Sequence, residues 1–123
     1  MRYINRFFSG MVLFLVIHMT YASSFVNTWV NQETNRPEIT RIDVIDSKEV
    51  KQIQVFASCA ESVCDWGVVK ASESEGGFNA VYEFGFKTVQ LELSPLDDRL
   101  QVSIFTDYHD GRPSTRNDYT LSR

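Results

Sequence analysis

The chain contains none of the short motifs that mark several common enzyme classes. It has no G-x-S-x-G nucleophile elbow, no glycine-rich phosphate loop and no H-E-x-x-H zinc motif. These absences exclude the hydrolase, nucleotide-binding and zinc-peptidase classes that the motifs define, and we expect that the protein is not an enzyme. A hydrolase that uses His109 or Asp110 is the remaining catalytic alternative.

Metal ligands are also few. The chain has only two cysteines, and a zinc site that used them would need further ligands. Asp107, His109 and Asp110 lie in one polar segment and could bind a hard or borderline cation. The spacing does not match an EF-hand loop, and Asp-Gly followed by proline is ordinary turn chemistry. We therefore expect a turn here, with no metal and no other cofactor.

Positive charge is in deficit. The 123 residues include 12 basic and 16 acidic side chains. Residues 1–22 hold two of the basic residues and no acid, which leaves ten basic and 16 acidic residues in the remainder, a net charge of −6. The acids are dispersed from Glu33 to Asp118 and form no tail. This balance argues against nucleic acid and anionic membranes as partners.

Long apolar runs are absent except at the start of the chain. Arg2 and Arg6 precede an apolar stretch over residues 7–19, and small residues occupy the −3 and −1 positions of a cleavage site at Thr20 and Ala22. This order is typical of a secretory signal peptide. We predict a signal peptide over residues 1–22, cleaved after Ala22, with cleavage after Ser23 or Ser24 as alternatives.

An uncleaved membrane anchor is the other interpretation of this stretch. Ser9, Gly10 and His18 interrupt the run, which falls short of the roughly 20 apolar residues that a spanning helix needs. No cysteine lies at the cleavage site, so the chain lacks the residue that a bacterial lipoprotein acylates. We expect an exported protein, periplasmic or secreted, with one domain over residues 23–123 and no membrane anchor after cleavage.

Cys59 and Cys64 both lie in the expected mature chain. Two cysteines in an exported protein most simply form one disulfide. A redox-active pair usually has the tighter C-x-x-C spacing, which differs from the spacing here. The closed loop is short, so chain entropy predicts about 2 kcal/mol of stabilisation. The bond would fix a local loop rather than the whole fold.

Beyond residue 22, no stretch has a helical period. Apolar and polar residues alternate instead, which is typical of half-buried strands. Thr40, Ile42 and Val44 share one face, for example, and Arg41 and Asp43 the other. The expected strands cover residues 25–30, 39–45, 50–57, 65–71, 78–86, 88–93, 100–104 and 118–122.

Turn-forming residues separate these runs, among them the segments 72–77 and 94–98. Gly85 leaves two alternatives, a tight hairpin or a glycine bend within one long strand. About eight strands with short links favour an antiparallel meander, which a chain of this length can close into a small barrel without exposed edges. We expect an all-β fold, a closed or nearly closed antiparallel barrel.

Trp29 lies in the first expected strand, and Arg123 follows the last one. In this arrangement the chain resembles the calycin group, which includes the lipocalins and avidins. The resemblance implies that the tryptophan packs across the closed end of the barrel and that the arginine covers it, as a cation–π pair. The glycine of the lipocalin G-x-W pattern is replaced by Asn27.

A second resemblance covers most of residues 25–123. Trp29-Val30-Asn31 is followed by Ile39-Thr40-Arg41-Ile42 (ITRI) and by C-x4-C-D-W-G over residues 59–67. This pattern looks like a family of small exported bacterial β domains. The resemblance implies export, a disulfide and a β fold, and it implies no activity.

Five aromatic residues are candidates for a ligand site: Trp66, Phe78, Tyr82, Phe84 and Phe86. The last four share one face of their expected strand, and Trp66 stands at a strand entry. Such residues form the core of a narrow barrel or line the cavity of a wider one. The hypothesis that follows is a non-enzymatic domain that binds a small apolar or amphipathic ligand.

The alternative function is a protein-interaction or inhibitor module. It would act through the disulfide loop between Cys59 and Cys64 and through the loop 108–116, since loops on a rigid scaffold often carry binding. Phe56 and Phe105 fall on the outward faces of their expected strands. Either would be an exposed patch for a partner, unless the expected register is wrong there.

Overall fold

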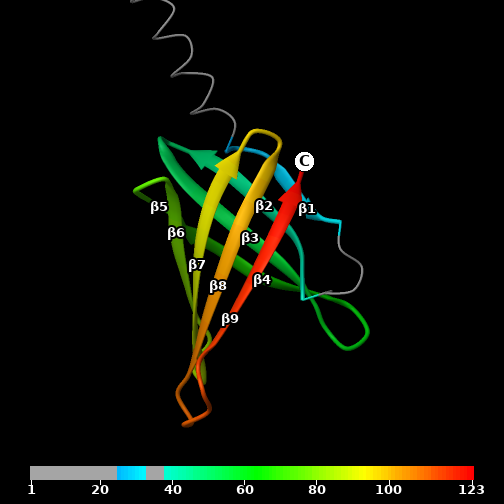
Figure 1. The fold of residues 1–123 in the computed structure, drawn as a ribbon, viewed down its shortest axis with the longest axis vertical. Helices are drawn as coiled ribbons and strands as arrows, with labels where there is room; N and C mark the ends of the chain where they lie inside the picture. Colours follow the sequence, from blue (N-terminus) through cyan, green and yellow to red (C-terminus); the bar gives the residue numbers. More distant parts are fainter. Residues whose placement is uncertain (1–24, 33–37) are drawn as a thin grey trace, which may run out of the picture.

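The computed structural model describes residues 25–32 and 38–123, which form nine antiparallel strands and no helix (Figure 1). The strands are β1 (Thr28–Asn31), β2 (Ile39–Ser47), β3 (Val50–Ser58), β4 (Val63–Lys70), β5 (Ser72–Ser74), β6 (Gly77–Glu83), β7 (Lys87–Leu96), β8 (Arg99–Tyr108) and β9 (Thr115–Ser122). The all-β prediction is confirmed. The predicted signal segment, residues 1–22, lies outside the described residues. Within those residues, no helix has the length and hydropathy to cross a membrane.

The described residues contain one strand more than the sequence predicts. The additional strand is β5, which pairs with β6 through Ser72↔Asn79 and Ser74↔Gly77, in a segment that we expected to be only a turn. All three residues of β5 are exposed and polar. Such a strand has no apolar alternation that a sequence pattern could reveal, because its backbone pairing alone defines it.

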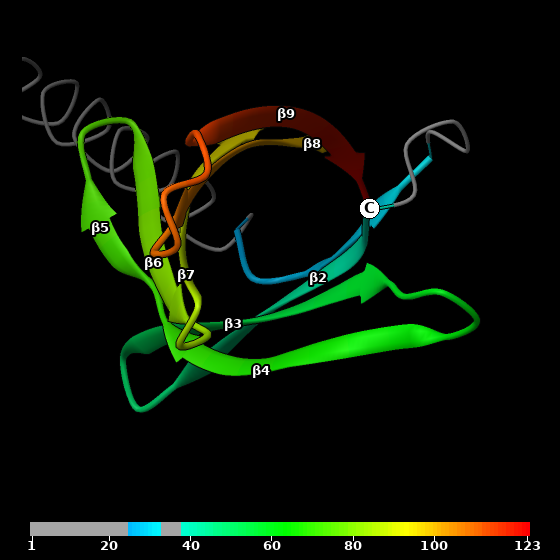
Figure 2. The ribbon, with the colours of Figure 1, turned by 90° about the horizontal axis from the view of Figure 1, so that it is seen from below.

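Strand neighbours are consecutive in the chain with one exception. The order across the sheet is β4-β3-β2-β1-β9-β8-β7-β6-β5. The exception is β1, which pairs with β2 on one side and with β9 on the other, so the first and last strands join the two halves of the meander. The sheet curls until β4 comes close to β6, as the view along the barrel in Figure 2 shows. The result is a nearly closed barrel.

The interior face of the curled sheet is apolar. In β3, Ile53, Val55 and Ala57 are buried and alternate with half-buried Gln52 and Gln54, as the sequence predicts. The largest fully buried side chains come from both halves of the sheet: Phe25, Trp29, Ile39, Ile42, Ile53, Leu91, Leu93, Leu100, Leu121, Val55, Val89 and Val102.

A bulge at the start of β2 changes the expected face of one residue. The register with β3 shifts between Ile39 and Arg41, so Ile39 and Ile42 are both buried in the core. Thr40 is half-buried, and its hydroxyl donates to the backbone carbonyl of Phe56 at 3.0 Å. The prediction that Thr40 shares the apolar face is therefore wrong, because the extra residue of a bulge interrupts the alternation.

The structure decides between the two alternatives at Gly85. β6 ends at Glu83 and β7 begins at Lys87, so the chain makes a tight hairpin. Gly85 has a φ of +84°, a conformation that favours glycine, and the Phe84 N–H donates to the Lys87 carbonyl at 3.0 Å. The expected strand 78–86 is thus wrong in its last three residues.

The other end of β7 is longer than expected. The strand runs to Leu96, and the turn predicted over 94–98 shrinks to Asp97 and Asp98. Pro95 pairs with Leu100 of β8, whereas pairing with β6 stops at Leu93. The proline is tolerated because it has a paired strand on one side only.

A bent strand interrupts the barrel wall. β4 pairs with β3, and after the single buried residue Ala71 the chain continues as β5, which pairs with β6. The Ala71 N–H donates to the Lys51 carbonyl at 2.8 Å and fixes the corner, which is visible in Figure 2. No strand pairing joins β4 to β6 within the described residues, so side chains must close this seam.

Residues 25–27, which directly precede β1, close one end of the barrel, the upper end in Figure 1. Phe25 is buried and stacks on Phe78 of β6, with ring centroids 3.9 Å apart. The Trp29 indole N–H donates to the Phe25 carbonyl at 3.1 Å, and the Arg123 guanidinium carbon lies 5.9 Å from the Trp29 ring centroid. The expected contact between Trp29 and Arg123 is therefore present.

Candidate functional site

The opposite end of the barrel holds an open cleft of about 620 Å³. We call this space the cleft. Buried apolar residues from four strands form its floor: Ile39, Ala57, Val89 and Ile104. A volume of this size and an apolar lining are typical of sites for small ligands, which commonly occupy about 300–1,000 Å³.

Three aromatic residues form one wall of the cleft. Trp66 comes from β4, and Phe84 and Phe86 come from the turn between β6 and β7. The Trp66 ring meets the Phe84 ring edge to face, with centroids 5.4 Å apart and planes at 76°. Phe86 is 55% exposed, so most of its ring is available to a ligand. These three residues are the part of the predicted aromatic site that the structure brings together.

The other two predicted site residues lie elsewhere. Phe78 packs on Phe25 at the closed end, far along β6 from the cleft. Tyr82 is buried in the seam between β4 and β6, behind Trp66, and does not line the cleft. Of the four aromatic residues expected on one strand face, only Phe78 and Tyr82 lie on β6, whereas Phe84 and Phe86 belong to the turn that follows it. The prediction of one shared face is therefore wrong for the last two.

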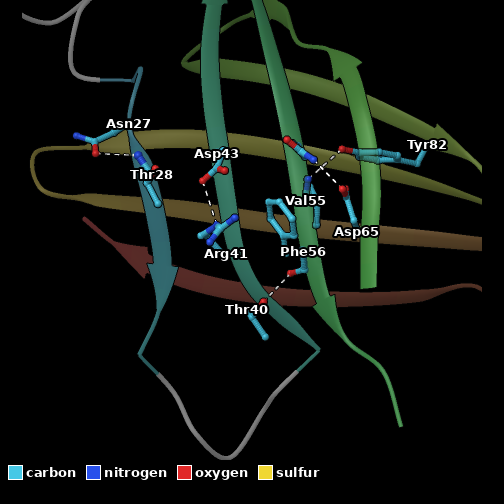
Figure 3. A network of polar contacts seen from close by, with 10 residues as sticks. Asn27, Thr28, Thr40, Arg41, Asp43, Val55, Phe56, Asp65 and Tyr82 are labelled. Atoms are coloured by element: carbon cyan, nitrogen blue, oxygen red, sulfur yellow. Dashed lines mark hydrogen bonds and ion pairs between the residues drawn. The ribbon is translucent and has the colours of Figure 1, made fainter. Parts of the chain in front are cut away.

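The Tyr82 hydroxyl closes the seam between β6 and β4. It accepts a hydrogen bond from the Val55 N–H at 3.3 Å, as Figure 3 shows, and donates to the Gly67 carbonyl at 2.8 Å. The ring also meets Trp66 edge to face, with centroids 5.5 Å apart. Burial raises the pKa of Tyr82 to about 12, because the phenolate would lose its hydration there.

A bulge in β4 sets the position of Trp66. The register between β3 and β4 shifts between Gln54 and Phe56, and Gly67 takes a φ of +87°. Asp65 accepts hydrogen bonds from the Gly67 N–H and from the Gln54 side-chain amide, both at 2.8 Å. The Gln54 hydrogen bond, followed by that of Gly67, lowers the pKa of Asp65. The hydrogen bonds of Asp65 thus hold the bulge, and a bulge re-aims the side chain that it carries.

Polar groups from the facing strands complete the cleft. Lys87 of β7, Thr106 and Tyr108 of β8, and Thr115 and Asn117 of β9 line it. Tyr108 and Thr115 belong to the loop 108–116 that we expected only as a contact for a protein partner, and the other three were not predicted as site members. Thr106 continues the inward alternation of Leu100, Val102 and Ile104, and this pattern could have indicated that its side chain faces the interior. No such pattern marks Lys87, because its position depends on the turn at Gly85.

The loop that follows β8 is fixed by its own polar contacts. The two His109 ring nitrogens lie 2.8 Å from the Gly85 carbonyl and 2.9 Å from the Thr88 hydroxyl. Asp110 pairs with Arg112 at 2.9 Å, and this contact lowers the pKa of Asp110. Among the described residues, no group of three histidine, cysteine or acidic side chains is arranged to hold a metal ion.

The disulfide between Cys59 and Cys64 is present, with Cα atoms 5.7 Å apart, and both cysteines line the cleft. The Cys59 N–H donates to the Ser62 carbonyl at 2.7 Å, so the bond and this contact together fix the β3–β4 turn. A disulfide fits an oxidising environment.

The two outward phenylalanines have arginine partners. The guanidinium carbon of Arg41 lies 4.1 Å from the Phe56 ring centroid, and that of Arg116 lies 5.2 Å from the Phe105 ring centroid. Both rings are half-buried and face outward, so the expected register is confirmed for both. Arg41 also pairs with Asp43 at 3.2 Å on the same face, as drawn in Figure 3.

Comparison of the chain with family models, with curated proteins and with solved structures finds no match in any of the three. The functional argument therefore rests on the cleft and its residues.

Proposed function

We propose that this protein is a non-enzymatic binding domain that holds a small apolar or amphipathic ligand in the cleft. The observation that carries the proposal is the asymmetry of the barrel. Phe25 and Trp29 fill one end, whereas the other end keeps an open space of about 620 Å³ above an apolar floor. An aromatic wall beside such a floor offers favourable contacts to an apolar molecule.

We propose also that the protein acts outside the cytoplasm. Two features support this: the predicted signal peptide over residues 1–22 and the disulfide between Cys59 and Cys64. Mass spectrometry of protein exported with its own N-terminus tests this point. A mass that begins at Ser23, with both thiols oxidised, supports export, and an uncleaved chain contradicts it.

The binding test uses N-phenyl-1-naphthylamine, an uncharged aromatic probe whose fluorescence rises in apolar surroundings. We expect saturable binding to the wild type. Phe86→Ala should raise the dissociation constant roughly fivefold, because loss of a half-exposed phenyl contact costs about 1 kcal/mol. Leu96→Ala is the matched control, since Leu96 is 58% exposed at the opposite end of the barrel.

Two outcomes would overturn the binding proposal. One is the absence of saturable fluorescence in the wild type. The other is an equal effect of Phe86→Ala and Leu96→Ala, which would place the probe outside the cleft. Phe86 is mostly exposed, so its truncation tests binding without a large effect on folding.

A protein-interaction module remains the second candidate, and one observation favours it. The disulfide loop supplies Cys59 and Cys64 to the edge of the cleft, and the loop 108–116 supplies Tyr108 and Thr115. A protein partner would thus meet both loops around one opening. Glu61→Lys and Arg112→Glu should weaken capture of such a partner by the immobilised protein. Unchanged capture by both variants would contradict this alternative.

A further inference from the structure

Lys87 is placed among three aromatic rings at the cleft. It is the first residue of β7 and lies opposite Tyr108 of β8. Its ammonium nitrogen is 5.3 Å from the ring centroid of Phe86, 5.6 Å from that of Phe84 and 6.0 Å from that of Tyr108. The rings fix a positive charge beside an apolar space.

Two carboxylates, Glu38 and Asp65, also line the cleft, and both accept hydrogen bonds from neutral donors rather than from Lys87. Glu38 accepts a hydrogen bond from the Tyr119 hydroxyl at 2.6 Å, and Asp65 accepts from Gln54 and from the backbone of Gly67. Within residues 25–32 and 38–123, no carboxylate lies within ion-pair distance of Lys87.

The second cation near this opening is already neutralised. Arg112 lies 4.1 Å from the Tyr108 ring centroid and pairs with Asp110. Lys87 is therefore the basic residue in the lining of the cleft, and it forms no ion pair with a carboxylate among the described residues. A charge in this position attracts an anion more strongly than a fully hydrated charge does, because apolar surroundings lower the local dielectric.

We infer that the ligand of the cleft is an amphipathic anion, a single-chain carboxylate whose head group meets Lys87 and whose apolar tail lies over Ile39, Val89 and Ile104. This inference rests on the proposed function. A cationic amphiphile would be repelled by the Lys87 charge at this end of the cleft. A neutral amphiphile would leave the ammonium group without an anion. An amphipathic anion can place an apolar tail on the apolar floor and a negative head group beside Lys87.

The test is displacement of bound N-phenyl-1-naphthylamine from the folded protein by three decyl compounds of different charge. The competitors are decanoate, decanol and decyltrimethylammonium, each below the concentration at which it forms micelles. We expect decanoate to displace the probe at a concentration at least tenfold lower than decanol, and decyltrimethylammonium to be the weakest. Equal potency of the three would overturn the inference but not the proposed function, because the probe would still bind.

Variants of one residue then assign the preference to Lys87. Lys87→Met keeps an unbranched side chain and removes the charge. It should reduce the ratio of the displacing concentration of decanol to that of decanoate from at least ten to near one. Lys87→Arg should restore a ratio above one. Lys70→Met removes the same charge from an exposed position outside the cleft and should leave the ratio unchanged. A ratio that persists in Lys87→Met, or that falls equally in Lys70→Met, would overturn the inference.

Discussion

The Tyr82 hydroxyl donates a hydrogen bond to the Gly67 carbonyl at 2.8 Å, across a seam that no strand pairing closes among the described residues. The same oxygen accepts from the Val55 N–H, next to the bulge where β3 and β4 lose their register. One side chain of β6 therefore satisfies backbone groups of two strands, β3 and β4, on the other side of the seam. The Tyr82 ring packs against two aromatic rings of the cleft wall, those of Trp66 and Phe84.

Tyr82→Phe should lower the free energy of unfolding by about 1–3 kcal/mol, because the change leaves the buried N–H of Val55 and the half-buried carbonyl of Gly67 without this partner. Urea unfolding followed by circular dichroism measures the loss. Tyr108→Phe is the control, since the Tyr108 hydroxyl makes no hydrogen bond within residues 25–32 and 38–123. A loss in Tyr82→Phe no larger than that in the control would contradict the role of the hydroxyl.

The same hydroxyl predicts a pH dependence. The pKa of Tyr82 is raised from 10.0 to about 12 in the folded state, so the unfolded chain releases the proton first as the pH rises. The contribution to stability is therefore complete below pH 10 and is lost between about pH 10 and 12, by up to about 2 kcal/mol. The difference in unfolding free energy between wild type and Tyr82→Phe should shrink over this interval. A constant difference would show that the hydroxyl does not titrate as described.

Removing the disulfide should have a modest effect. The double variant Cys59→Ser, Cys64→Ser should lose about 2 kcal/mol of stability and still fold, because the bond closes a loop of only six residues. Thermal unfolding compared with fully oxidised wild type measures the change. A shift near zero, with oxidation of the wild type verified by mass, would be the contrary result. Complete loss of the fold would equally contradict a local role.

Arg123→Ala should reduce stability by about 0.5–1 kcal/mol, since Arg123 lies over the fully buried ring of Trp29 and makes a cation–π contact there. Arg123→Lys should recover part of the loss. Arg99→Ala is a suitable control, because Arg99 is exposed and forms no ion pair in the described part of the chain. Equal stability of Arg123→Ala and wild type would show that the contact contributes nothing measurable.

Alternation along the chain predicted most of the strands, because a half-buried sheet requires side chains to face inward at every second residue. The prediction fails where a bulge adds a residue. Thr40 and Gly67 both lie at register shifts, and neither shift has a strong sequence signal. The three-residue strand β5 is missed for a related reason, since its exposed polar residues carry no apolar period.

The site was predicted only in part, because alternation along a strand indicates which face an aromatic residue occupies but not which end of the barrel it reaches. Trp66, Phe84 and Phe86 meet at the cleft, whereas Phe78 reaches the closed end. Lys87 could not be assigned to the site, because its orientation follows from the positive φ of Gly85 and from pairing with a strand 21 positions later. Both features depend on the tertiary structure, and no local sequence pattern indicates them.

The pairing of β1 with β9 has a consequence for the order of folding. Every other strand pair joins neighbours in the chain and can form as a local hairpin, within microseconds for an isolated turn. The contacts Val30↔Ser122 and Asn31↔Leu121 join the two ends of the described chain, so their formation carries the largest cost in loop entropy. We therefore expect these contacts to form last and to open first, and amide exchange at Val30 and Leu121 would report that opening before global unfolding.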